Sequence, residues 1–271
     1  MKTRVITAAV LIPVLLLILL AAPKIVLALV WGAMLSVAAY ELLYRTGLVQ
    51  HVRLVVYAAV MAFAVSMWSF FGAMHAYAVL GVLVFMAVLF GELMYDHVKI
   101  TFDKICMCFV AGLLIPMLLS SLVRIQTLKI GRYVILIPFI VAFASDAGAY
   151  FVGRALGKHK LAPVISPHKT IEGVAGGMLS AIVCMILYTL IMQFGFKFRV
   201  NYLYAILYGL IGSIAGTFGD LCFSVVKRQT GIKDYGTIIP GHGGILDRFD
   251  SMTMVGPLME VFLTLIPVIV G

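Results

Sequence analysis

Long apolar stretches with almost no charge recur along this sequence from its start to its end. The runs Val5–Ala22 and Ile25–Tyr40 are the first two, and each is near the roughly 20 residues that a helix needs to cross a bilayer. The 271-residue chain is 63% apolar and only 11% charged, whereas soluble domains carry about 25% charged residues. We therefore predict an all-α polytopic integral membrane protein. Soluble enzymes, disordered chains, nucleic-acid-binding domains and disulfide scaffolds are excluded.

Nine apolar segments can be marked, and we expect about nine transmembrane helices. Their residue ranges are 4–22, 24–44, 52–70, 76–92, 105–123, 133–153, 173–194, 202–226 and 250–270. We expect the first to be a retained helix and not a cleaved signal peptide, because it is long and Pro23 stands where cleavage would fall. The sequence shows no long-period repeat and no linker, so we expect one membrane domain over residues 1–271.

The basic residues are distributed unevenly between the two sides of the predicted membrane domain. With nine spans, the amino terminus shares one side with the polar loops 154–172 and 227–249, and that side holds fourteen of the twenty Lys and Arg residues. Basic loops stay in the cytoplasm, so we expect both polar loops there. The net charge of +9 then suits anionic headgroups or an anionic substrate, with no nucleic acid as partner. The fourteen residues are Lys2, Arg4, Arg45, Arg53, Lys99, Lys104, Arg154, Lys158, Lys160, Lys169, Lys227, Arg228, Lys233 and Arg248.

Asp220 is a charged residue inside the eighth apolar segment, where charge is costly and usually functional. Ser224 and Lys227 follow it four and seven residues later, so all three share one helix face. This face leads from a carboxylate within the membrane to a basic pair, Lys227 and Arg228, at its edge. The pattern predicts that Asp220 is a cation ligand and that the neighbouring basic pair binds phosphate. The alternative is an ordinary ion pair at the end of a helix.

The loop that follows combines glycines, carboxylates and basic residues. Gly241, Gly243 and Gly244 let the backbone approach a ligand closely and direct N–H groups at anionic oxygens. Asp247 and Asp250 share a face if the ninth helix has begun by Asp247, and carboxylates suit Mg²⁺. Together these residues indicate metal-assisted chemistry on a phosphorylated substrate; an ordinary solvated loop is the alternative.

A second polar block surrounds the end of the sixth segment. Asp146, Tyr150 and Arg154 are spaced four residues apart, so they share one helix face that leads from a carboxylate to a basic residue. Thr170 can cap the amino end of the seventh helix, where Ser166 and Lys169 could hold a phosphate. The roles of Glu172, in the first turn of that helix, and of Glu260 stay open. The Gly212-to-Gly216 spacing favours helix packing.

These two blocks resemble the signature of the phosphatidate cytidylyltransferases. Residues 224–250 begin SVVKR and end PGHGGILDRFD, and residues 145–173 read SDAGAYFVGRALGKHKLAPVISPHKTIEG. Family members often carry Thr at the position of Ala147 and Trp at that of Ile171, so these two positions are not counted among the contacts. The resemblance is strong over residues 140–255, and before residue 100 it amounts to hydropathy alone.

The resemblance implies a membrane-embedded nucleotidyltransferase that converts CTP and phosphatidic acid to CDP-diacylglycerol and pyrophosphate in phospholipid biosynthesis. Residues 133–271 would form the catalytic part, and the helices within 1–132 have no clear role. Mg²⁺ is implied, with a second cation such as K⁺ allowed. Metal ligands would be Asp220 and Asp247, with Asp146 and Asp250 as further candidates. Catalytic residues would be Lys227, Arg228, Lys233, His242 and Arg248. Substrate-binding residues would be Arg154, Lys158, Ser166, Lys169, Thr170, Ser224, Gly243 and Gly244.

Two other functions stay open at this point. A CTP-dependent lipid kinase or another lipid nucleotidyltransferase would need a general base for an attacking alcohol. An ion transporter would also carry intramembrane carboxylates, but it should show paired halves with matching broken helices. The polar motifs here lie only in the second half of the chain, which favours the enzyme. We expect it in the inner (plasma) membrane with its site facing the cytoplasm; a homodimer is left open.

Overall fold

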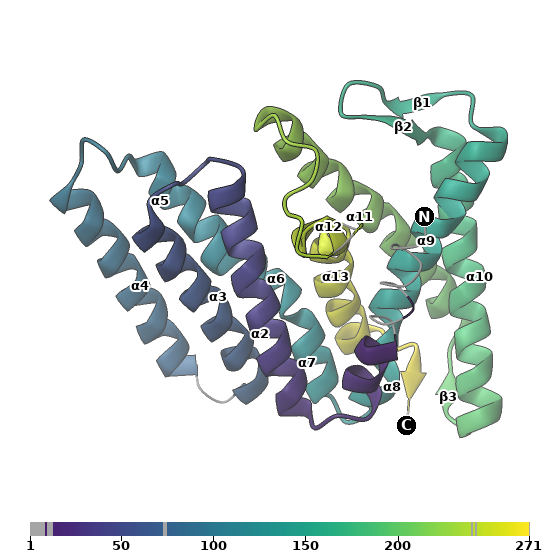
Figure 1. Cartoon of the computed structure of the whole chain (residues 1–271). Helices are drawn as coiled ribbons and strands as arrows, with labels where there is room; N and C mark the ends of the chain where they lie inside the picture. Colours follow the sequence, from purple (N-terminus) through teal and green to yellow (C-terminus); the bar gives the residue numbers. More distant parts are fainter. Residues whose placement is uncertain (1–8, 10–12, 73–74, 240, 242, 271) are drawn as a thin grey trace. The chain divides into compact units, whose positions relative to one another are not determined.

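A computed structural model describes residues 9, 13–72, 75–239, 241 and 243–270 of the chain (Figure 1). Within these residues, seven helices are long and apolar enough to cross a membrane, which confirms an all-α integral membrane protein. They coincide with the second to eighth predicted segments. The seven spans are Lys24–Arg45, Val52–Phe71, Ala76–Tyr95, Phe102–Thr127, Gly131–Leu156, Ile171–Phe196 and Tyr202–Gln229.

The first and last predicted segments have different outcomes. Most of the segment 4–22 lies outside the described residues, and the part that is described is helical from Pro13 to Leu20. The last segment forms α13 (Met252–Leu265), a helix of 14 residues that contains Pro257. At about 1.5 Å per residue such a helix is roughly 21 Å long, shorter than the ~30 Å hydrocarbon core.

The chain divides into two compact units. The first unit comprises residues 1–127 and 229–249. It contains α2 (Lys24–Tyr40), the π-helix η1 (Glu41–Arg45), α3 (Val52–Phe71), α4 (His75–Tyr95), α5 (Phe102–Phe109), the π-helix η2 (Val110–Leu114), α6 (Ile115–Leu119), α7 (Ser121–Thr127) and α12 (Leu246–Phe249).

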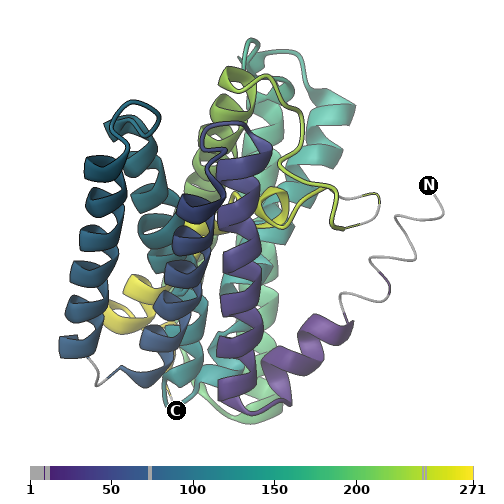
Figure 2. The same ribbon diagram turned by 60° about the vertical axis from the view of Figure 1, so that its left-hand side comes forward.

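In the first unit, α3 packs against α2 and α4 (Figures 1 and 2). Gly32 allows the close approach of α2 and α3, because an added Cβ atom would lie 2.8 Å from the Phe63 ring, and hydroxyl groups join the two helices. Ser36 Oγ donates to the carbonyl oxygen of Ala59 at 2.7 Å, and Ser66 Oγ donates to that of Ala28 at 2.8 Å. Such bonds between helices are common where lipid offers no alternative partner.

The second unit comprises residues 128–228 and 250–271. It contains α8 (Gly131–Val134), α9 (Leu136–Leu156), β1 (Lys160–Ala162), β2 (Ser166–Thr170), α10 (Ile171–Phe196), β3 (Arg199–Val200), α11 (Tyr202–Gln229), α13 and β4 (Ile269–Val270).

Helices α9 and α10 of the second unit lie in close contact because glycines face their neighbours (Figure 1). A Cβ atom added to Gly148 would collide with Ser180, and one added to Gly176 would collide with Val152. At Gly212 an added Cβ would lie 2.6 Å from Val141 and 2.9 Å from Met259. This confirms the helix-packing interpretation of that glycine.

The predicted loop 154–172 contains a short antiparallel hairpin that the sequence analysis did not predict. Strands β1 and β2 pair Lys160 with Thr170 and Ala162 with Ser166. A second pair of strands, β3 and β4, joins Arg199 to Val270 and Val200 to Ile269. Strands this short carry too few residues for an alternating pattern to be recognised in the sequence.

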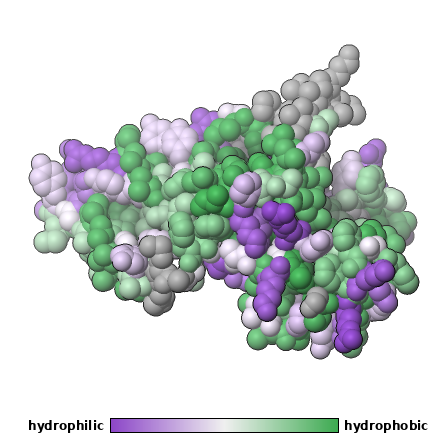
Figure 3. Space-filling view, turned by 90° about the horizontal axis from the view of Figure 1, so that it is seen from below, coloured by the Kyte–Doolittle hydropathy of each residue, from purple (hydrophilic) through white to green (hydrophobic). Residues whose placement is uncertain are grey.

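Figure 3, taken from below the view of Figure 1, shows hydrophobic residues next to hydrophilic ones on this face. Helix α4 exposes many apolar side chains. Its residues Leu80, Leu83 and Val84 are each more than half exposed, and only 11% of its most apolar window is buried within the protein. A helix that is apolar on its exposed face is stable in lipid and not in water.

Candidate functional site

In the second unit, the hairpin and α11 are joined by an ion pair. Lys169 Nζ, on β2, lies 2.5 Å from Asp220 Oδ2, and both side chains are about three-quarters buried. Ser224 Oγ donates to Asp220 Oδ1 at 3.2 Å, which confirms that Asp220 and Ser224 share a helix face. One carboxylate of α11 therefore accepts from a hydroxyl on its own helix and pairs with an ammonium group from the hairpin.

A second ion pair lies about two turns further along α11. Lys227 Nζ is 3.7 Å from Asp250 Oδ2, and these side chains are only 12% and 13% exposed. Asp250 lies between α11 and α13, where its Oδ1 accepts from the Ser251 N–H at 2.8 Å. Burial, reinforced by the negative charge of Asp220, raises the pKa of Asp250 to about 7. Asp146 on α9 acts in the same direction, so two further carboxylates raise the pKa of Asp250.

The start of α10 is fixed by side chains that cap it. Thr170 Oγ1 accepts from the Gly173 N–H at 3.1 Å, which confirms the predicted cap. Glu172 accepts from the backbone N–H groups of Lys158 and His159, and it also contacts the His159 ring at 2.6 Å. Glu172, whose role was left open, therefore ties the segment after α9 to the first turn of α10.

The other predicted residues of this unit have more peripheral positions. Arg228 Nε donates to the carbonyl oxygen of Ile165 at 3.2 Å and so contacts the turn of the hairpin. Arg154 Nη1 donates to Tyr150 OH at 3.2 Å along α9. Lys158 takes part through its backbone, and Ser166 lies in β2. The substrate roles predicted for these residues stay predictions.

In the first unit, the glycine-rich loop comprises residues 230–245, between α11 and α12. Asp247, in α12, holds this loop together. Its Oδ2 accepts from the Tyr235 N–H at 2.7 Å and from the Gly244 N–H at 3.0 Å. Ile239 N–H donates to the Gly243 carbonyl oxygen at 3.0 Å. Gly241 and Gly243 have φ values of 76° and 89°, which L-residues rarely adopt. Asp247 lies in the short helix α12, whereas the last apolar segment becomes helical only at Met252, after Asp250. The condition that the ninth helix has begun by Asp247 is therefore not met, and the shared-face argument for Asp247 and Asp250 was wrong.

This loop surrounds a polar cavity of about 470 Å³. Arg248 and the predicted Gly243 lie on its wall, while Lys233 is exposed on the same loop. His242 lies outside the described residues, so its predicted role is unchanged. The lining residues are Asp234, Gly236, Thr237, Ile239, Gly241, Gly243 and Arg248.

Glu41 is a residue of this region that the sequence analysis missed. It is completely buried in η1, at the end of the first long helix. Its carboxyl oxygens accept from the backbone N–H groups of Ile245 and Leu246 at 3.1 Å and 2.9 Å. The signal was available, because Glu41 is a single carboxylate within an apolar segment, the pattern that drew attention to Asp220.

The carboxylates of the second unit fit the chemistry of Mg²⁺. Within the described part of the chain, no three His, Cys, Asp or Glu side chains form a ready-made metal site. Mg²⁺, however, is often held by one or two carboxylates while waters and substrate phosphates supply its other ligands. Asp220 and Asp250 offer such oxygens beside Lys169 and Lys227. The metal role shared by Asp220 and Asp247 stays a prediction.

Seven apolar helices long enough to span a membrane, one of which carries charged pairs, define an integral membrane protein. A family model described as "Cytidylyltransferase family" matches residues 2–266. The chain therefore belongs to the cytidylyltransferase family.

Curated relatives agree with this family. The phosphatidate cytidylyltransferase of Bacillus subtilis is 42% identical over 166 residues, which cover 61% of this chain and 60% of the relative. That of Staphylococcus haemolyticus is 49% identical over 133 residues, covering 49% and 50%. That of Staphylococcus epidermidis is 48% identical over 138 residues, covering 51% and 52%. The matched part of the chain thus spans between half and three-fifths of each relative's length.

Proposed function

We propose that this protein transfers a cytidylyl group from CTP to phosphatidic acid, forming CDP-diacylglycerol and pyrophosphate. The observation that carries the proposal is the charged cluster at the end of α11, where Lys169 meets Asp220 and Lys227 meets Asp250. A lipid headgroup and a soluble nucleotide can meet at the end of a membrane-spanning helix. The family match and the names of the relatives support these two substrates.

The reaction needs no nucleophile from the protein. A phosphate oxygen of phosphatidic acid attacks the α-phosphorus of CTP, a new P–O bond forms, and the bond to the β-phosphate breaks to release pyrophosphate. The protein must instead bring two anions together, and two unit charges about 4 Å apart repel by roughly 4 kcal/mol at an effective dielectric near 20. In this proposal Lys169, Lys227 and Arg228 reduce that repulsion by binding phosphate oxygens.

Asp220 and Asp250 are the residues proposed to hold Mg²⁺ within the second unit. When bound there, the ion would neutralise charge on the phosphates of the two substrates. The cluster also explains why the lysines are present, because an ammonium group offsets each carboxylate when the substrates are absent. On substrate binding, Lys169 and Lys227 could exchange a carboxylate partner for a phosphate.

Incubation of the purified protein with CTP, phosphatidic acid and Mg²⁺ tests the proposal. We expect a lipid-soluble cytidine product and one equivalent of pyrophosphate. Diacylglycerol should not replace phosphatidic acid, because it lacks the attacking phosphate. Release of CDP with phosphorylation of a lipid alcohol would instead establish the lipid kinase alternative. No turnover under any of these conditions would contradict both enzymes.

We also propose that the polar loops face the cytoplasm, as the distribution of basic residues indicates. In a variant without its four native cysteines, single cysteines can replace Lys160, Lys233 or Lys129. A membrane-impermeant maleimide should label the first two only from the cytoplasmic side. It should label the third only from the opposite side. Labelling of position 160 or 233 from outside the cell would contradict this orientation.

A further inference from the structure

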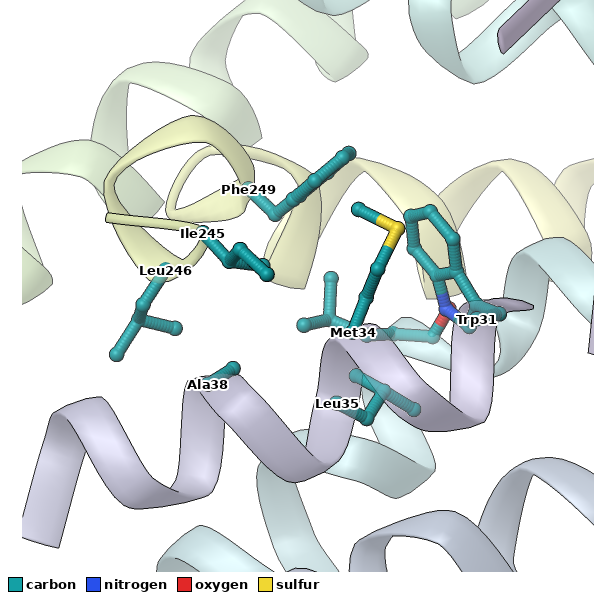
Figure 4. Close-up of a pocket in the computed structure, with 8 residues that line it drawn as sticks. Trp31, Met34, Leu35, Ala38, Ile245, Leu246 and Phe249 are labelled. Atoms are coloured by element: carbon teal, nitrogen blue, oxygen red, sulfur yellow. The ribbon is translucent and has the colours of Figure 1, made fainter. Parts of the chain in front are cut away.

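The amino-terminal helices had no predicted role, yet α2 and its continuation η1 contact α12 and the end of the glycine-rich loop at several points. All of these segments belong to the first unit. Figure 4 shows side chains of α2 and of residues 245–249 facing one another around a small cavity. The Trp31 and Phe249 rings meet edge to face, with centroids 4.9 Å apart. Trp31 is itself fixed, because its Nε1 donates to the Leu119 carbonyl oxygen at 3.0 Å.

Apolar packing holds the loop against α2 but leaves its backbone polar groups to be satisfied. Ile245 and Leu246 pack near Ala38, Leu35 and Met34 (Figure 4). Leu246 is 1% exposed, so a backbone N–H at this point has little access to water. A buried N–H without an acceptor costs about 1–3 kcal/mol. An acceptor from α2 or its continuation is therefore required.

Glu41 provides this acceptor one turn beyond Ala38. Each of its two carboxyl oxygens accepts one N–H, from Ile245 and from Leu246, just where α12 begins. Two parallel bonds to one carboxyl group fix the direction of the backbone as well as its distance. The next residue in the chain is Asp247, whose Oδ2 holds the rest of the loop through Tyr235 and Gly244.

The glycines of the loop match the position of Glu41. A Cβ atom added to Gly244 would lie 2.5 Å from Glu41 Oε1, and its three nearest atoms would all belong to the Glu41 carboxyl group. A Cβ added to Gly236 would collide with the same oxygen. Neither glycine has a positive φ. A larger residue at either position is therefore excluded by contact with Glu41 and not by backbone conformation.

We infer that Glu41 is a positioning residue, which docks the glycine-rich loop on α2 and so sets the cavity that contains Arg248. The inference rests on the proposed function only where it concerns turnover. It assigns to α2 the task of a rigid platform for a loop whose own backbone is rich in glycine. Arg45, on the same π-helix, adds a contact with the Thr237 hydroxyl at 3.4 Å.

Hydrogen exchange of the Ile245 and Leu246 amides tests the docking directly. Glu41→Gln replaces one acceptor oxygen by an NH₂ group, which faces an N–H that it cannot bind. We expect exchange in peptides containing these amides to accelerate about tenfold or more, on the scale of one lost bond to a charged group. Peptides from the core of α3 should exchange at their normal rate. Acceleration there as well would indicate general unfolding, and Glu41→Asp would then be measured as the conservative variant.

Glu92→Gln is the matched control, because Glu92 also belongs to the first unit and is mostly buried. It bonds to Tyr57 and Arg53 and is not among the partners of the loop. We expect the Ile245 and Leu246 amides to exchange at the wild-type rate in this variant. Unchanged exchange in both Glu41→Gln and Glu41→Ala would overturn the docking role.

A double substitution tests the contact with Gly244. Gly244→Ala alone should accelerate exchange, since its methyl group displaces the Glu41 carboxyl group. In a Glu41→Ala background it should add little, because the obstacle and the anchor are already gone. If the effects of Gly244→Ala and Glu41→Ala on the exchange rate were fully additive, the contact between Gly244 and Glu41 would be contradicted.

Kinetics separate this inference from the proposed function. With a cytidylyl-transferring wild type, Glu41→Gln should lower kcat/KM for CTP at least severalfold, and Glu92→Gln should not. Faster loop exchange with unchanged kcat and KM would overturn the positioning role in turnover. A wild type that shows no cytidylyl transfer, but in which Glu41→Gln accelerates exchange, would contradict the proposed function and leave the docking role in place.

Discussion

Lys169 Nζ lies 2.5 Å from Asp220 Oδ2, so a strand of the hairpin and α11, the longest of the described helices, share one ion pair. Both side chains are largely but not completely buried. In such a setting each charge depends on the other, because removal of one leaves its partner poorly solvated. The pair therefore holds the hairpin against α11, and it places one positive and one negative side chain next to each other.

Removal of both charges should be less harmful to stability than the single changes suggest. We expect Lys169→Met and Asp220→Asn each to lower the thermal midpoint in detergent, and their coupling energy to be about 0.5–3 kcal/mol. Lys160→Met is the control, because it removes a lysine from β1 of the same hairpin. Its effect should simply add to that of Asp220→Asn. Additivity for Lys169→Met as well would contradict the ion pair.

Substitution of Asp220 should affect catalytic activity in a different way from thermal stability. Asp220→Asn should lower kcat/KM on the order of 100-fold, as expected when one electrostatic group is removed from a catalytic site. The double variant with Lys169→Met should recover stability without recovering turnover. Recovery of both would indicate that Asp220 has only a structural task.

The same distinction between a structural and a catalytic role can be tested at Asp247. Asp247→Asn can still present one oxygen to the Tyr235 and Gly244 N–H groups, whereas Asp247→Ala cannot. We expect hydrogen exchange in the loop to stay slow in Asp247→Asn and to accelerate in Asp247→Ala. If the carboxylate also binds a cation, Asp247→Asn should lose turnover while the loop stays protected. Normal turnover in Asp247→Asn would limit this residue to a structural role.

The sequence predicted the membrane fold well because hydropathy depends on local composition. Helix-face arguments also succeeded within one helix, as the bond between Ser224 and Asp220 shows. Contacts between distant segments could not be obtained in this way, since periodicity contains no information on partners. The pairing of Lys227 with Asp250 and of Lys169 with Asp220 are examples.

Glu41 illustrates a different kind of failure. The segment 24–44 was treated only as a span, although it contains a carboxylate that lipid would not tolerate unpaired. Its partners are backbone N–H groups about 200 residues away, as the separation of 204 residues from Ile245 shows. Backbone donors have no signature in the sequence, so the position of Glu41 could be noticed but its contact could not be predicted.

Two glycines of the first unit allow the role of backbone conformation to be separated from that of space. Gly243 has a φ of 89°, and a Cβ added to it would lie 3.0 Å from Asp247 Oδ2. Gly231 has a φ of 71°, and an added Cβ would meet no atom within 4 Å. Alanine should cost about 1–2 kcal/mol at both for the left-handed backbone. Only Gly243→Ala should also disturb Asp247, so we expect it to lower kcat/KM severalfold while Gly231→Ala stays near wild type. Equal losses would contradict this reasoning.

Metal dependence provides a test of the carboxylate cluster that does not rely on turnover alone. EDTA should abolish activity and excess Mg²⁺ should restore it. If Asp220 and Asp250 hold the ion, Mg²⁺ at about 100 times its dissociation constant should stabilise the folded protein by roughly 2.7 kcal/mol. The thermal midpoint in detergent should rise accordingly. This rise should disappear in Asp220→Asn and Asp250→Asn but persist in Asp103→Asn, which removes a carboxylate from α5 of the first unit. A rise of equal size in all four proteins would show that the ion binds elsewhere. Asp220 and Asp250 would then keep only their protein partners, the ion pairs with Lys169 and Lys227 and the hydrogen bonds from Ser224 and Ser251.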